Sequence, residues 1–105
     1  MSESFYDDEI APKLMKLAKR CEERDMSLVA LCEFERGDSG ATLTVRENAG
    51  CSMRMVRYAT QAFGNVDKLI MALIADGKKY GHSSMYLTML ENMEKQHEDL
   101  LRRAD

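Results

Sequence analysis

The sequence contains no tryptophan, one proline, three cysteines and two histidines among its 105 residues. Cys21, Cys32 and Cys51 are odd in number and form no CxxC pair, which excludes a disulfide framework and a zinc-finger pattern. Reduced thiols in a cytoplasm are the simplest interpretation. His82 and His97 lie far apart and match no metal-ligand motif, so we predict neither a metal site nor a cofactor.

Net charge and long apolar runs are also limited. A formal charge of −3 excludes a nucleic-acid mimic that works by charge alone, and it gives no broad basic surface for binding nucleic acid. The longest apolar run, Leu69 to Ala75, is too short to cross a bilayer, and the acidic N-terminus has no apolar signal segment. We therefore expect a cytoplasmic protein that has no membrane partner, with nucleic acid disfavoured as a partner.

Residues 1–6 are predicted to be a flexible arm, and residues 7–105 a single α+β domain. Asp7 or Asp8 can cap a helix over about residues 8–25, and Pro12 falls near its first turn, where proline is tolerated. Apolar side chains then recur at helical spacing.

A β-hairpin is predicted to follow. Residues 28–32 are a continuous apolar run typical of a strand, 36–40 have the composition of a turn, and 41–46 alternate between apolar and polar side chains. Because a lone two-stranded hairpin is marginal in water, we expect it to pack on helices 8–25 and 66–80, or to pair by an edge with a second copy.

Three more helices complete the chain, and serine or asparagine precedes each as a capping residue. The predicted order is α-β-β-α-α-α, an α+β fold in which the hairpin packs on a helical bundle. Glycine stops end the first two of these helices at Gly64 and Gly81. The predicted spans are about 53–63 after Ser52, 66–80 after Asn65, and Ser83 or Ser84 to about 102.

The last helix has apolar residues at the 4-3-4-3 spacing of a coiled-coil seam. A core of this size can hardly bury such a stripe, so we expect the helix to close the core and also to contribute to a homodimer. The predicted partner-binding residues are Tyr86, Met89, Leu90, Met93, His97 and Leu100.

Methionine is abundant, at nine residues, and six of them lie on the last three predicted helices. Methionine fills irregular gaps in cores and also adapts to varied partner surfaces. Core filling is the more common of these two roles, and the sequence leaves both open.

Two other functions are compatible with the sequence. A helix N-terminus can hold an anion, so a phosphate or nucleotide could bind near Arg46, Ser52, Arg54 and Arg57. Helices 53–63 and 66–80 could instead form the helix-turn-helix of a DNA-binding regulator. The second of these helices is apolar nearly all round, which does not suit a recognition helix.

Sequence motifs of enzymes are missing. No serine elbow, P-loop, dinucleotide-binding glycine pattern or HExxH is present. Cys51 precedes a predicted helix, where a thiolate is favoured, but no histidine lies within ten residues to act as its base. We expect a protein that is not an enzyme.

Three short segments, Asp8-Glu9-Ile10-Ala11-Pro12, Gly64-Asn65-Val66-Asp67 and Gly81-His82-Ser83-Ser84, resemble small uncharacterised proteins of phage and prophage accessory regions. The resemblance extends over most of the chain and implies no activity and no site residues. It does imply a context, because small phage accessory proteins often bind host defence or regulatory proteins. The expected function is therefore steric inhibition of a host protein in the host cytoplasm, in the manner of anti-CRISPR proteins.

Overall fold

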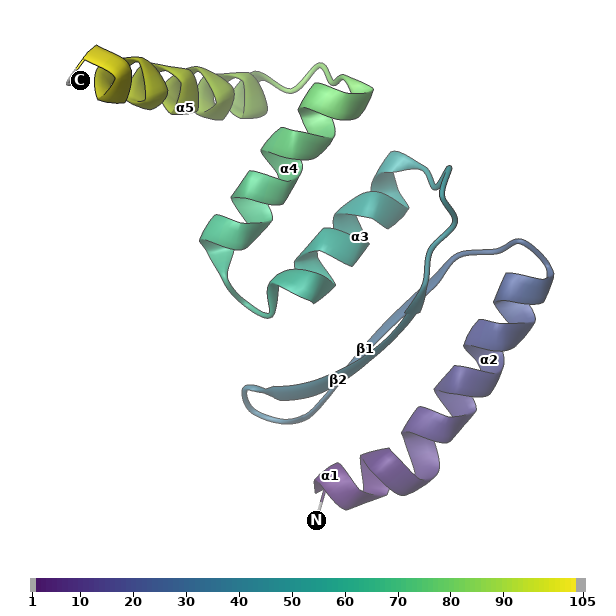
Figure 1. Ribbon diagram of the computed structural model, residues 1–105. Coiled ribbons are helices and arrows are strands. Elements are labelled where there is room, and N and C mark those ends of the chain that lie inside the picture. Colours follow the sequence, from purple (N-terminus) through teal and green to yellow (C-terminus); the bar gives the residue numbers. More distant parts are fainter. Residues whose placement is uncertain (1, 104–105) are drawn as a thin grey trace. The chain divides into compact units, whose positions relative to one another are not determined.

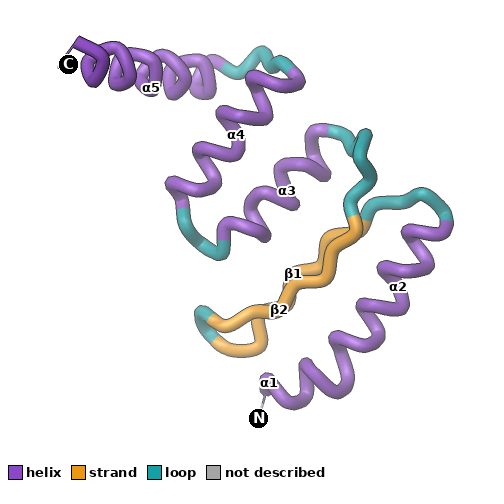
Figure 2. The backbone as a smooth tube through the Cα atoms, in the orientation of Figure 1, coloured by secondary structure: helices purple, strands orange, loops and turns teal. Residues whose placement is uncertain are grey.

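A computed structural model describes residues 2–103 of the chain (Figures 1 and 2). The order α-β-β-α-α-α and the α+β class are confirmed, with one π-helical segment, η1, inside the first helix. The chain divides into two compact units, Met1–Gly64 and Asn65–Asp105. The elements are α1 (Ser2–Phe5), η1 (Tyr6–Ile10), α2 (Ala11–Glu23), β1 (Leu28–Glu35), β2 (Asp38–Thr44), α3 (Cys51–Ala62), α4 (Val66–Tyr80) and α5 (Met85–Arg103).

The first helix begins earlier than the sequence predicted. Helical backbone runs from Ser2, so residues 2–5 are not the expected arm, and Asp7 and Asp8 lie exposed within η1 instead of capping a helix near residue 8. The π-helical turn directly precedes Pro12, which lacks the N–H that would otherwise bond to the Asp8 carbonyl oxygen four residues back. Within the turn, the Ala11 N–H donates to the Tyr6 carbonyl oxygen, five residues away.

Tyr6 connects this helix to the hairpin. Its side chain is buried, its ring lies 5.3 Å from that of Phe34, and it occupies the space directly over Gly40. Gly40 was predicted to be part of the turn, yet it lies in β2 opposite Cys32. The turn itself is only Arg36 and Gly37, and the φ of +85° at Gly37 is one that glycine adopts without strain.

The two faces of the hairpin are covered differently. The even-numbered residues 28–34 of β1 and 40–44 of β2 are half-buried on the face toward α1, η1 and α2, whereas Asp38 at the start of β2 is exposed. The alternation at 41–46 would place its apolar side chains inward, but Ala41 and Leu43 are exposed and Thr42 and Thr44 are half-buried. The absence of a side chain at Gly40 lets Tyr6 of the first helix lie directly on β2.

Helix α3 packs on the opposite, odd-numbered face, against β1 (Figure 1). Helices 8–25 and 66–80 were expected to pack on the hairpin. The first expectation is confirmed, and within this unit the second helix on the hairpin is α3. Gly50, not the expected Ser52, is the N-cap residue of α3. The helix ends at Phe63, which has left-handed backbone (φ 51°) and is followed by Gly64, the predicted stop.

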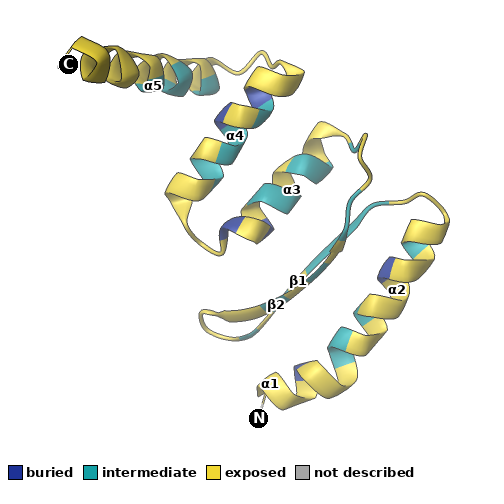
Figure 3. Ribbon diagram, viewed as in Figure 1, coloured by how far each residue is buried: buried dark blue, intermediate teal, exposed yellow. Residues whose placement is uncertain are grey.

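The second unit is a pair of helices whose boundaries the sequence predicted closely. The Asn65 side chain accepts a hydrogen bond from the Lys68 N–H at 3.0 Å, and the Ser84 hydroxyl accepts one from the Leu87 N–H at 3.1 Å. At Gly81, where φ is +82°, α4 stops as predicted. Ile74 and Gly77 are the buried residues of α4 (Figure 3).

The contact between Tyr6 and Gly40 gives a first prediction. Gly40→Ala should destabilise the chain by about 1–3 kcal/mol, because a Cβ at residue 40 overlaps the Tyr6 ring and buried rings have little room to move. Urea unfolding followed by circular dichroism measures this loss. In a Tyr6→Leu background the same substitution should cost less, and equal costs in both backgrounds would contradict the proposed overlap.

Candidate functional site

A close helix corner positions the last helix. Gly77 allows α4 and α5 to approach, since a Cβ there would lie 3.0 Å from Leu87 Cδ2 and 3.1 Å from Glu91 Oε1. Farther along, Lys78 Nζ lies 3.2 Å from Glu94 Oε1. The face of α5 that carries Leu87, Glu91 and Glu94 is therefore the one that faces α4.

His82 closes this corner. Its Nδ1 accepts a hydrogen bond from the Ser84 N–H at 3.0 Å, so the ring proton must lie on Nε2. Nε2 then donates to Glu91 Oε1 at 2.9 Å. The imidazole thus caps the start of α5 and ties the connector to the middle of that helix.

A second face of α5 is open to solvent (Figure 3). Of the six predicted partner-binding residues, Leu90 alone is half-buried, and the other five, His97 among them, are exposed. We call the six together the α5 stripe. Four of its members and two apolar neighbours each expose 54–74% of their surface. These six residues are Met85, Tyr86, Met89, Met93, Leu100 and Leu101.

The size of this surface is unusual for a region with nothing packed on it. The six exposed apolar side chains present on the order of 700 Å², against the ~800 Å² that one partner contributes to a standard protein interface. None of the six residues of the α5 stripe has a carboxylate, ammonium or guanidinium group. Patches of this kind on soluble proteins mark binding sites for other macromolecules.

The methionines follow the same pattern throughout the described chain. Seven of the eight at positions 2–103 expose 48–70% of their surface, and the remaining one, Met53, is half-buried. Core filling, the more common role, is therefore not the role of these side chains. Flexible thioethers on a surface suit contact with a partner of irregular shape.

The predicted anion site near α3 is not assembled around one point. Arg46 Nη2 lies 3.2 Å from Asp25 Oδ2, and the Arg46 N–H donates to the Ser27 hydroxyl at 2.9 Å. These contacts fix Arg46 to the loop between α2 and β1. Its guanidinium therefore has a structural carboxylate partner.

The other residues of that predicted site also have separate surroundings. Arg54 Nη1 donates to the Ala49 carbonyl oxygen at 2.8 Å, and the Arg57 guanidinium lies 5.2 Å from the centre of the Tyr58 ring. Ser52 is exposed in the first turn of α3. Only Arg54 reaches the start of α3, and it binds a carbonyl there.

Cys51 is exposed at the first position of α3. Its Sγ lies 3.7 Å from Met55 Sδ, so its neighbour is a thioether with no capacity to act as a base. Cys21 and Cys32 are half-buried. These surroundings suit structural thiols.

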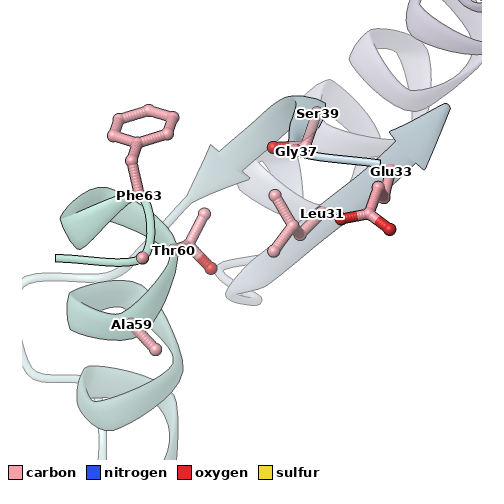
Figure 4. A pocket seen from close by; sticks show the side chains of 8 residues that line it. Leu31, Glu33, Gly37, Ser39, Ala59, Thr60 and Phe63 are labelled. Atoms are coloured by element: carbon pink, nitrogen blue, oxygen red, sulfur yellow. The ribbon is translucent and has the colours of Figure 1, made fainter. Parts of the chain in front are cut away.

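A groove of about 250 Å³ lies between the odd face of the hairpin and α3 (Figure 4). Leu31 and Glu33 line it from β1, and Ala59 and Thr60 from α3, while the exposed Phe63 ring points away from Leu31. Every buried side-chain polar atom of the described residues has a hydrogen-bond partner. The groove therefore offers no unsatisfied group that would indicate a particular ligand.

No protein-family model, curated protein or solved structure matches the chain. Across residues 2–103, no cluster of three or more histidine, cysteine or acidic side chains is arranged to hold a metal ion. Within the same range, none of the helices combines the length and apolar character needed to cross a bilayer.

The His82 corner gives the second prediction. His82→Ala removes both hydrogen bonds and should lower the amide-exchange protection of residues 85–94 about 5- to 30-fold, the effect of ~1–2 kcal/mol. His82→Asn is the matched variant, because its shorter side chain can still accept from the Ser84 N–H but cannot reach Glu91. It should lose less protection than His82→Ala, as hydrogen-exchange mass spectrometry can show. Unchanged protection in both variants would contradict the assigned role.

Proposed function

We propose that this chain is a non-enzymatic interaction protein that binds another protein through the α5 stripe. The observation that carries this proposal is the exposure of Tyr86, Met89, Met93 and Leu100 along one side of a helix whose other side is already packed on α4. An amphipathic helix with a second apolar face can bury that face in a groove of a partner.

The form of the stripe favours a protein over a small molecule as partner. From Tyr86 to Leu100 it extends for ~21 Å along the helix, at about 1.5 Å per residue. A helix surface is convex, whereas small ligands bind in concave pockets. The fitting partner is an apolar groove or a second helix with acidic groups near one end, because Arg102 and Arg103 follow the stripe.

The resemblance to phage accessory proteins supports a more specific version of this proposal. The partner would be a host defence or regulatory protein, and the chain would inhibit it by occupying a surface that the host protein needs. Steric occlusion requires no catalytic group, which agrees with the separate structural roles of the arginines and cysteines. We also propose that the protein acts as a homodimer.

Two exposed methionines test the stripe without disturbing the core. Met89→Asp with Met93→Asp places two charges in the proposed interface, where unpaired buried charge is strongly unfavourable. The matched control, Asn92→Asp with Lys95→Gln, changes the net charge by the same amount on another exposed face of α5. Leu90 is left unchanged because it is half-buried.

The three forms of the full chain would be immobilised and incubated with a bacterial lysate. A host protein retained by the wild type and by the control, and reduced at least tenfold by the stripe variant, is the expected result. Equal retention by all three forms, or no specific retention by the wild type, would contradict the proposal.

A further inference from the structure

The two strands of the hairpin differ in how their outer edges are protected. Soluble proteins commonly protect free sheet edges with charged residues, prolines or bulges. β1 has Glu33 and Glu35 and an irregularity in register between them. β2 has a single charge, Asp38, at its first position, and the six residues 39–44 have neither charge nor proline.

The even face of β2 packs on α2, but its odd face is open. Its neighbour in the sheet is β1, and among the described residues no other strand pairs with it. On the odd face, Ala41 and Leu43 of β2 are exposed, since α3 packs against β1. A two-stranded sheet is marginal in water, and added strands with an apolar face stabilise it.

We propose that β2 pairs antiparallel with β2 of a second copy of this chain, forming a four-stranded sheet across a two-fold axis. A strand can pair with its own copy in this way only if like charges do not meet near the axis. The uncharged run 39–44 meets that condition. The edge of β1 meets it less well, because Glu33 and Glu35 lie within the strand and pairing centred near them would bring each close to the same residue of the copy.

Charge and side-chain pairing select one register. With Thr42 opposite Thr42 of the copy, Asp38 of each chain lies opposite Arg46 of the other. Each guanidinium then gains a second carboxylate beside Asp25, and its five donors can serve both. In this register Ala41 lies opposite Leu43 of the copy, so the four exposed apolar side chains form one cluster on the odd face.

The proposed dimer surface and the α5 stripe share no residue, so the two proposals concern different side chains. The inference goes beyond the proposed partner binding, and each can fail without the other.

Two variants of the same positions test both the interface and the register. In the proposed register, Ala41→Lys with Leu43→Lys sets lysine opposite lysine twice in each dimer. Ala41→Lys with Leu43→Glu sets lysine opposite glutamate twice. Both positions are exposed in the single chain, and circular dichroism checks that each variant keeps the helical and strand content of the wild type.

Light scattering over a concentration series, applied to the full chain, measures the outcome. The wild type should have twice the 12.0 kDa mass of one chain. The lysine–lysine variant should raise the dimer dissociation constant at least tenfold, and the lysine–glutamate variant should remain dimeric. A monomeric wild type, equal dissociation of both variants, or loss of the dimer in Met89→Asp with Met93→Asp would overturn the inference.

Discussion

The Met1–Gly64 unit depends on the absence of a side chain at residue 40. Because Gly40 has no side chain, the Tyr6 ring can lie directly on β2 at this residue and also contact Phe34. That contact holds the helical residues before Pro12 close to the hairpin, and the π-helical turn η1 accommodates the proline without a break in the helix. It also determines the orientation of β2, whose threonines face the first helix while Ala41 and Leu43 face outward. The free apolar edge and face of β2 are therefore consequences of the same contact.

The Asn65–Asp105 unit uses a comparable arrangement with a different result. Gly77 makes room for the His82 ring, and His82 orients the start of α5 through Ser84 and Glu91. Since the packed face of α5 is fixed by these contacts, the opposite apolar residues have no partner within the helix pair. Both units thus have few buried residues, Tyr6, Ala18, Thr60 and Ala62 in the first and Ile74 and Gly77 in the second, and leave many large flexible apolar side chains exposed. Such a division is expected of a protein whose main contacts are with other chains.

Local signals in the sequence were sufficient for most of the fold. Asn65, Gly81 and Ser84 act through bonds to near neighbours in the chain, so the boundaries of α4 and the start of α5 were predicted correctly. The errors arose where distant residues meet. Gly40 reads as a turn residue unless Tyr6 is known to lie on it, and the early start of the first helix has the same cause. The seam of α5 was visible as a spacing, but the burial of Leu90 and the exposure of His97 depend on which face meets α4. Whether Arg46, Arg54 and Arg57 converge on one anion site could likewise be judged only from the groups that each guanidinium contacts in the structure.

The account stands on the claim that the α5 stripe remains open on the folded protein, in the dimer as well as in the single chain. Brief oxidation of the native protein with hydrogen peroxide, followed by peptide mass spectrometry, measures this directly for each methionine. Met89 and Met93 should form sulfoxide about as fast as the exposed Met71, and several times faster than the half-buried Met53. Oxidation of Met89 and Met93 at the slow rate of Met53 would show that the stripe is already covered, and it would contradict the account.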